Sequence, residues 1–199
     1  MIQLHYNEGE QQELFPLIDE EGRVVGRATR KYCHGGSMAL HPVVHLHVLD
    51  ADGRLYLQKR SMKKDIAPGK WDTSVGGHVD YGESLADAVV REASEELGLH
   101  IVADDCRFLF QYIWQSSRER ELVTAFCIVA DDDVVPQPDH DEVDEGRYFT
   151  IEELRSHIGQ EYFTQQFENE ELAHLLNTLG DSKKLIEKKS QILNNSHSQ

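Results

Sequence analysis

Four glutamates gather in one short segment of this chain, beside a single arginine. They are Glu83, Glu92, Glu95 and Glu96, with Arg91 among them. Residues three and four apart on a helix share a face, so Glu92, Glu95 and Glu96 are expected to point together. Carboxylates this close repel one another by roughly 0.2–0.5 kcal/mol per pair. Either an exposed acidic face balanced by arginine and lysine compensates for this repulsion, or bound cations do.

Bound cations are the interpretation that the neighbouring residues favour. Oxygen ligands clustered on one rigid face suit Mg²⁺ or Mn²⁺. The glycine pair Gly76-Gly77 precedes the segment, and glycine lets a backbone carbonyl approach the same ion without side-chain obstruction. Cations held there would neutralise a diphosphate, bridge its oxygens and lower the pKa of a bound water.

A helix is predicted to position the carboxylates. The apolar residues at helical spacing are Ala86, Val90, Ala93 and Leu97. Gly98 follows, where a helix C-terminus favours glycine. The pattern predicts about four helical turns from Ser84, with the apolar stripe directed into the core and the glutamates directed elsewhere.

Strands and further helices are predicted around this helix. Hairpins are expected at 16–30 and 41–60, strands at 107–114, 121–130 and near 147–149, and helices at 150–158 and about 164–179. Strands interleaved with helices indicate an α/β or α+β sandwich. We expect one domain over residues 1–180, with an N-terminal β-hairpin extension, and a polar, disordered tail at 181–199.

The composition limits the classes of partner. A formal net charge of −16 on 199 residues would repel the phosphates of a nucleic-acid duplex. The sequence has neither a long apolar run nor a signal-peptide pattern, which predicts a cytoplasmic protein without a membrane span. The three cysteines are widely spaced and are expected to be reduced.

The glutamate segment resembles a known motif, the Nudix box, at every defined position. The pattern is Gly77, five residues, Glu83, seven residues, Arg91-Glu92-Ala93, one residue, Glu95-Glu96, one residue, Gly98-Leu99. The resemblance implies the Nudix fold, a mixed β-sheet between α-helices. It also implies Mg²⁺- or Mn²⁺-dependent hydrolysis of a nucleotide-type or related organic diphosphate, by an enzyme that is commonly a homodimer.

The same resemblance implies roles for single residues. The metal ligands would be the Gly77 carbonyl, Glu83, Glu92, Glu95 and Glu96, with Glu83 in a supporting place. Arg91 would orient the glutamates by ion pairing. A catalytic glutamate from a later loop often joins such a site, and Glu142 and Glu145 are both candidates.

A wider resemblance covers most of residues 17–155. The segments "DEEGRVVGRATR", "CHGGSMALH", "GRLYLQKRSMKKDIAPGKWDTSVGGH" and "ERE" are similar to the Nudix branch that contains isopentenyl diphosphate isomerase. The resemblance implies a second divalent metal, Zn²⁺ or Mn²⁺, on His34, His41, His78, Glu119 and Glu121. It also implies diphosphate contacts from Arg60 and Lys64. His45 and His47, on the same predicted strand as His41, are interpreted as bystanders.

Gly76 is the main departure from that branch. The isomerase has its catalytic cysteine at this position, and glycine offers no ionisable group. The box, by contrast, is complete. A Nudix hydrolase is therefore the leading hypothesis, and the alternatives are an isomerase-like enzyme acting on prenyl diphosphates and a non-catalytic nucleotide sensor.

Overall fold

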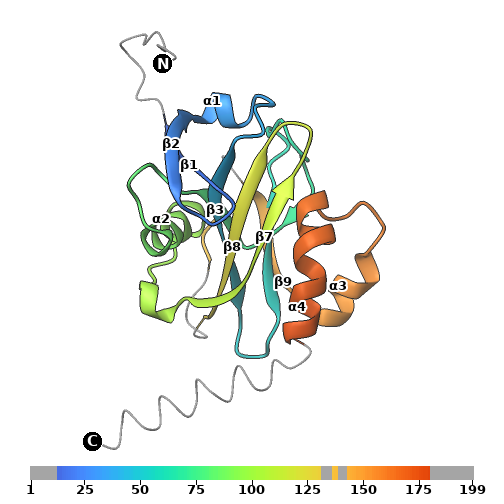
Figure 1. Ribbon diagram of the computed structural model, residues 1–199. Coiled ribbons are helices and arrows are strands. Elements are labelled where there is room, and N and C mark those ends of the chain that lie inside the picture. The colour runs from blue at the N-terminus through green and yellow to red at the C-terminus, as the bar shows by residue number, and fades with distance from the viewer. Residues whose placement is uncertain (1–12, 131–135, 139–142, 180–199) are drawn as a thin grey trace, which may run out of the picture.

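A mixed β-sheet lies between helices in the computed structural model, which describes residues 13–130, 136–138 and 143–179 (Figure 1). The strands are β1 (Leu14–Ile18), β2 (Val24–Thr29), β3 (Leu40–Leu49), β4 (Leu55–Arg60), β5 (Trp71–Asp72), β6 (Val75–His78), β7 (Arg107–Gln115), β8 (Arg120–Val129) and β9 (Val143–Phe149). The helices are α1 (Arg30–Cys33), α2 (Leu85–Leu97), η1 (Ala103–Asp105), α3 (Ile151–His157), η2 (Phe167–Glu171) and α4 (Leu172–Leu179). The predicted fold class is confirmed, and the predicted tail at 181–199 lies outside the described residues.

The main sheet divides where β3 and β4 separate. Its order is β5-β4-β3-β8-β7, with β6 also paired to β3 and β9 also paired to β4. The two strands of the predicted 41–60 hairpin form, but they pair only at Leu49 and Leu55, beside the turn. Beyond that point β6 replaces β4 beside β3, and β5 replaces β3 beside β4. The other edges of β3 and β4 pair with β8 and β9 along their whole length. The divergence leaves room between the strands.

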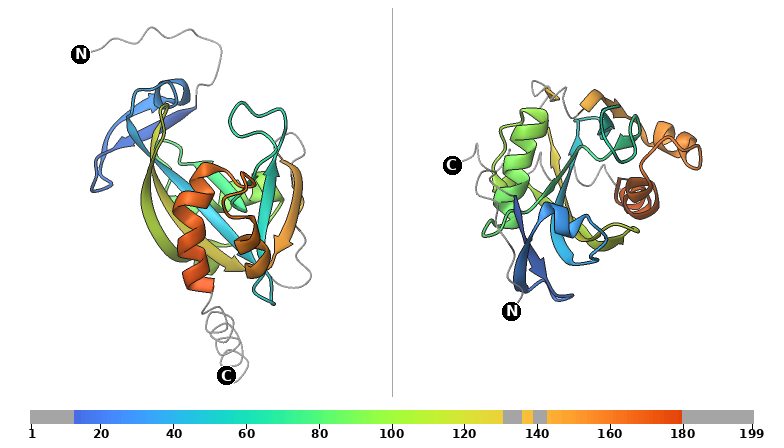
Figure 2. Two further views of the ribbon diagram at one scale, coloured as in Figure 1. Left: turned by 90° about the vertical axis from the view of Figure 1, so that its right-hand side faces the viewer. Right: turned by 90° about the horizontal axis from the view of Figure 1, so that it is seen from above.

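Two hydrophobic cores cover the two faces of the sheet. Side chains alternate along a strand, so Val44, Leu46 and Val48 of β3 pack toward α2. On the other face, Phe149 of β9 and Trp71 of β5 pack beneath α3, η2 and α4. Seen from above, α2 lies on one side of the sheet and α4 on the other (Figure 2). The helices therefore enclose the sheet from both sides.

Helix α2 begins and ends where the sequence predicts, but its buried face differs. The Ser84 hydroxyl accepts a hydrogen bond from the Asp87 amide, and Gly98 adopts a left-handed φ of 61°. The predicted stripe is wrong at Ala86, which is exposed. The buried residues are Ala88, Val89, Ala93 and Leu97. Val89, Ala93 and Leu97 are spaced four residues apart, so together they form a slightly oblique row along the helix, and this row faces the sheet.

The N-terminal hairpin and the last helix frame the site. Strands β1 and β2 form a separate two-stranded antiparallel sheet, as predicted for the hairpin at 16–30, and Phe15 is fully buried beneath it. The predicted helix at 164–179 contains a π-helical segment, η2, before α4. Such segments are rare and often occur at functional sites. No helix within the described ranges has the length and apolar character that a membrane crossing needs.

Candidate active site

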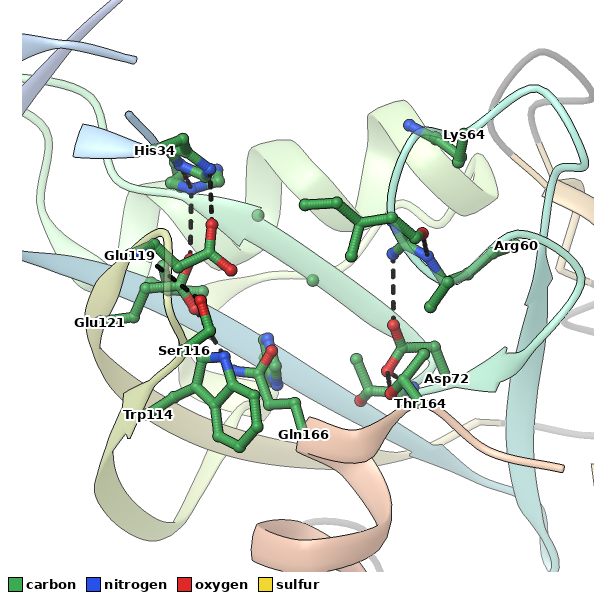
Figure 3. A pocket seen from close by; sticks show the side chains of 18 of the residues that line it. His34, Arg60, Lys64, Asp72, Trp114, Ser116, Glu119, Glu121, Thr164 and Gln166 are labelled. Carbon is green, nitrogen blue, oxygen red and sulfur yellow. Dashed lines mark hydrogen bonds and ion pairs between the residues drawn. The ribbon is translucent and has the colours of Figure 1, made fainter. Parts of the chain in front are cut away.

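A cavity of about 740 Å³ opens where β3 and β4 diverge (Figure 3). Its walls come from β3, β4, β6, β8, the C-terminal half of α2 and the segment before η2. Among the residues predicted for the site, those on the wall are His34, Arg60, Lys64, Gly77, His78, Arg91, Glu92, Glu95, Glu96, Glu119 and Glu121. The fold thus brings the box carboxylates and most of the histidine cluster to one space.

Arg91 ties the acidic residues of the box together. Its Nε and Nη2 donate to the two carboxylate oxygens of Glu83, both over 2.9 Å. Its Nη1 donates to Glu92 Oε1 over 2.8 Å and to Glu95 Oε2 over 3.0 Å. Burial opposes ionisation of Glu83, but the hydrogen bonds from Arg91 outweigh it and lower the pKa of that carboxyl. These four hydrogen bonds, two of them a fork onto Glu83, exceed the three N–H donors of a lysine ammonium.

Gly77 makes room for Glu92. A Cβ on Gly77 would lie 1.9 Å from Glu92 Cδ, far inside van der Waals contact. Burial raises the pKa of Glu92, although Arg91 opposes the rise. Glu96 accepts hydrogen bonds from Gln58 Nε2 over 2.9 Å and from the Gly76 amide over 3.3 Å. The donor set, carboxylates around a bare glycine backbone, fits Mg²⁺ or Mn²⁺.

Three histidines and one glutamate converge at the hairpin end of the cavity. One ligand atom from each of His34, His41, His78 and Glu121 falls within a group whose members all lie within 4.8 Å of one another. His34 Nε2 lies 2.9 Å from His78 Nε2. His41 Nε2 is buried and has no hydrogen-bond partner among the described residues. A divalent cation would satisfy that orphaned nitrogen, so these residues fit a second metal.

The surroundings keep these imidazoles suitable as ligands. Burial lowers the pKa of His78 to about 4 and also lowers the pKa of His41, so both rings are neutral at neutral pH. Glu119 Oε2 lies 2.8 Å from His34 Nδ1 and orients that ring. Phe15 stacks on His78 with ring centroids 4.3 Å apart and so holds that ring from the side of the N-terminal hairpin.

The two cationic residues predicted to contact phosphate lie across the cavity from His34 (Figure 3). Arg60 Nη1 donates to Asp72 Oδ2 over 3.2 Å, and its Nε donates to the Ile66 carbonyl over 3.1 Å. These two bonds fix the guanidinium, and its Nη2 makes no hydrogen bond with any residue that the structure describes. Lys64 lies on the same wall.

The two candidate glutamates from the later loop fall outside this cavity or outside the described chain. Glu145 is on β9, and its half-exposed carboxylate lies 3.9 Å from Lys59 Nζ. It does not line the cavity. Glu142 lies outside the described residues.

Sequence reasoning missed the polar residues behind the cavity wall. His45, set aside as a bystander, lines the cavity, and His47 is fully buried behind it. Both alternate with apolar residues on the strand that carries His41, a spacing that places all three on one face. Their carboxylate partner, Glu171, lies 126 positions from His45, and no local pattern links the two.

Comparisons with known proteins agree with this geometry. The family model described as the NUDIX domain matches residues 39–167. The chain is 35% identical over 150 residues to a protein of Brevibacterium linens named isopentenyl-diphosphate Delta-isomerase, covering 73% of this chain and 81% of that relative. It is 35% identical over 108 residues to a protein of Streptomyces coelicolor called an uncharacterized Nudix hydrolase, covering 54% of this chain and 59% of the relative.

A solved structure shows the same fold. The crystal structure of DR0079 from Deinococcus radiodurans superimposes with a TM-score of 0.67 at 26% identity, covering 84% of this chain and 99% of that one. The matched segment includes the acidic helix, its glycine pair and the histidine strand, so the comparisons bear on the part of the chain that builds the cavity. The chain belongs to the NUDIX family.

Proposed function

We propose that the protein is a divalent-metal-dependent hydrolase that cleaves a diphosphate linkage in a nucleotide-type or related organic substrate. The observation that carries the proposal is the common wall: Glu92, Glu95 and Glu96 line the same cavity as Arg60. A diphosphate needs cations on one side and fixed donors on the other. The cavity offers carboxylate ligands for the cations and fixed donors for the phosphate within one space.

Each residue then has a physical task. Glu92, Glu95, Glu96 and the Gly77 carbonyl would hold Mg²⁺ or Mn²⁺, which when bound supplies charge neutralisation and an activated water. Arg91 keeps the glutamates in one arrangement through its four carboxylate hydrogen bonds. Arg60 and Lys64 would bind the phosphate oxygens at the far side. One carboxylate of the box would take the proton from the attacking water.

The cysteines support hydrolysis over isomerisation. Gly76 lines the cavity without a side chain, and none of the three thiols lines it. Cys33 is buried in the cluster beneath the N-terminal hairpin, and burial raises its pKa to about 11. Burial likewise raises the pKa of Cys127 to about 11. A thiol with such a pKa is a poor acid or base at neutral pH.

An isomerase-like enzyme acting on prenyl diphosphates is the second candidate, and the Brevibacterium linens relative favours it. The fit of His34, His41, His78 and Glu121 to a metal favours it too. The two candidates differ in the bond that changes. Isomerisation in D₂O would place deuterium on the carbon skeleton, whereas hydrolysis would leave the carbon unlabelled and release a phosphate.

The test is a screen followed by a matched pair of double variants. Nucleoside diphosphates, dinucleotides, sugar nucleotides and prenyl diphosphates would be assayed for phosphate release with Mg²⁺ and with Mn²⁺. Replacing Glu95 and Glu96 by glutamine should abolish turnover and keep the fold. The control replaces Asp104 and Asp105, an exposed acidic pair outside the cavity, by asparagine, which makes the same change in charge.

Undiminished metal-dependent phosphate release by the Glu95/Glu96 variant would refute the proposal. A wild-type protein that is stabilised by nucleotides without forming product would instead identify a non-catalytic sensor.

A further inference from the structure

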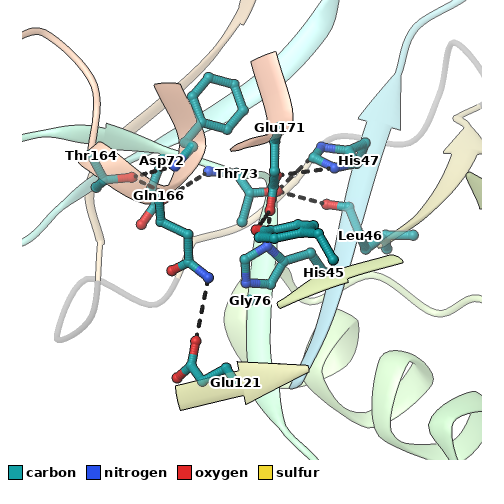
Figure 4. A network of polar contacts seen from close by, with 12 residues as sticks. His45, Leu46, His47, Asp72, Thr73, Gly76, Glu121, Thr164, Gln166 and Glu171 are labelled. Atoms are coloured by element: carbon teal, nitrogen blue, oxygen red, sulfur yellow. Dashed lines mark hydrogen bonds and ion pairs between the residues drawn. The ribbon is translucent and has the colours of Figure 1, made fainter. Parts of the chain in front are cut away.

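A buried carboxylate behind the cavity wall holds one histidine of that wall (Figure 4). Glu171, in η2, is fully buried. Its Oε1 accepts hydrogen bonds from His45 Nδ1 and, over 2.6 Å, from the Tyr112 hydroxyl. Its Oε2 lies 3.2 Å from His47 Nε2. Glu171 is therefore held by hydrogen bonds from His45 of β3 and Tyr112 of β7, with His47 of β3 close to its second oxygen.

Because the network is buried, its charged groups must be paired with one another. A lone buried carboxylate is strongly unfavourable, so Glu171 needs a cationic partner to remain ionised. Burial disfavours the charged form of His45, but the adjacent Glu171 outweighs it and raises the pKa of His45 to about 9. The same contact holds the pKa of Glu171 well below its usual range against the effect of burial. At neutral pH His45 is thus an imidazolium, with a proton on each ring nitrogen.

The second nitrogen of that ring faces the cavity. A Cβ on Gly76 would lie 3.2 Å from His45 Nε2, so the absence of a side chain at position 76 leaves the nitrogen uncovered. His45 lines the cavity, and its Nε2 makes no hydrogen bond within the described part of the chain. The carboxylate of Glu121 is close enough to favour the charged ring, but its Oε2 accepts a hydrogen bond from Gln166 over 3.3 Å and it makes none with His45 in the described part of the chain. His45 therefore presents a charged, unpaired N–H donor to the cavity.

We propose that His45 binds an anionic oxygen of the substrate's diphosphate through Nε2–H, and that Glu171 is the positioning residue that holds the imidazole in this orientation. The inference rests on the proposed function, because it assigns the ligand as the diphosphate of that reaction. A charge-assisted donor inside a cavity walled by carboxylates needs an acceptor that arrives with its own cations. A metal-loaded diphosphate has that chemistry.

The variant His45→Asn tests the role of Nε2 apart from that of Nδ1. An asparagine amide reaches about as far as Nδ1, so it can still donate to Glu171, but it has nothing at the place of Nε2. The measurement is calorimetric binding of methylenediphosphonate, a diphosphate analogue that cannot be hydrolysed, in the presence of Mg²⁺. The variant should bind it roughly 10-fold to 100-fold more weakly, the range for a hydrogen bond to a charged group. His174→Asn, an exposed histidine on α4 outside the cavity, is the matched control and should bind as the wild type does.

A second measurement keeps the inference testable if His45→Asn fails to fold. In ¹⁵N-labelled wild-type protein, both ring nitrogens of His45 should carry protons at pH 7.5, and the Nε2 signal should shift when methylenediphosphonate is added. In Glu171→Gln the same ring should lose its second proton at that pH, which a purely structural role for Glu171 would not cause. Two results would overturn the inference: wild-type affinity of His45→Asn for methylenediphosphonate, or an Nε2 signal that does not shift when the analogue is added.

These results are distinguishable from those that test the proposed function. If His45→Asn hydrolyses the substrate with unchanged KM, the His45 assignment fails while the hydrolase stands. If the wild type binds the analogue through His45 yet hydrolyses no diphosphate, the hydrolase fails while the assignment stands.

Discussion

Replacing Gly77 by alanine should disable the site while leaving the fold intact. Neither Gly77 nor Gly26, a glycine of β2, adopts a positive φ, so alanine meets no backbone strain at either position. At Gly77, however, the new Cβ would lie 1.9 Å from Glu92 Cδ and 2.1 Å from Glu92 Oε1. Ordinary carbon contacts are about 3.5–4.0 Å, so the Glu92 carboxylate must move by roughly 1.5–2 Å. Misplacement by about 1 Å costs on the order of 100-fold in rate, so kcat/KM should fall at least that far.

The assay combines Mn²⁺ binding, phosphate release and thermal unfolding. The displaced atoms, Cγ, Cδ and Oε1 of Glu92, all belong to one side chain and none to the backbone, so the free energy of unfolding should change by less than about 2 kcal/mol. Gly26→Ala is the matched control: its Cβ would meet nothing nearer than Leu17 Cδ1 at 3.9 Å, and Gly26 lies outside the cavity. Gly77→Ala protein that binds Mn²⁺ and turns over as well as Gly26→Ala protein would show that Gly77 is not needed to place the Glu92 carboxylate.

Three further outcomes follow from the contacts of the site. Arg91→Lys should weaken Mn²⁺ binding by roughly 10-fold to 100-fold in a calorimetric titration, because an ammonium has no planar fork and too few N–H groups for the four hydrogen bonds to Glu83, Glu92 and Glu95; unchanged affinity would mean that the glutamates hold their arrangement without the guanidinium. His41→Gln should lower Zn²⁺ affinity at least about 10-fold, measured by competition with a chelator, because its orphaned Nε2 is the nitrogen that a cation would satisfy; a wild-type protein with no Zn²⁺ affinity would contradict this. The His45–Glu171 pair should make stability depend on pH. The pKa of His45 is about 9 in the folded state against 6.5 unfolded, so its contribution is complete below pH 6.5 and is lost as the pH rises through 9. Urea unfolding should therefore show a loss of about 2 kcal/mol between pH 6.5 and 8.5. That slope should vanish in Glu171→Gln, and an equal slope in both proteins would exclude the pair as its source.

Local periodicity predicted the elements well, because each signal lies within a few residues. The alternation along residues 41–49 gives β3, and the capping residues Ser84 and Gly98 give the ends of α2. The spacing of the glutamates placed Glu92, Glu95 and Glu96 on one wall of the cavity. These features are short-range consequences of strand and helix geometry.

Pairings between distant segments could not be predicted in the same way. Nothing local shows that β3 and β4 pair only at Leu49 and Leu55, and that β6 takes the place of β4 beside the rest of β3, although that divergence opens the cavity. Nothing local joins His45 to Glu171 either, since the contact depends on where η2 docks. The buried face of α2 was misassigned at Ala86 because the sheet, not the helix, decides which line of residues is covered.

The central claim is that water attacks phosphorus in a cavity built from the box carboxylates. Its most direct test is one reaction, with the substrate found by the screen, in a mixture of H₂¹⁸O and D₂O containing Mg²⁺, followed by ³¹P NMR and mass spectrometry. We predict ¹⁸O in a released phosphate product and no deuterium on carbon. The Glu95/Glu96 double variant should release no labelled phosphate. An intact diphosphate with deuterium in its carbon skeleton would contradict the account.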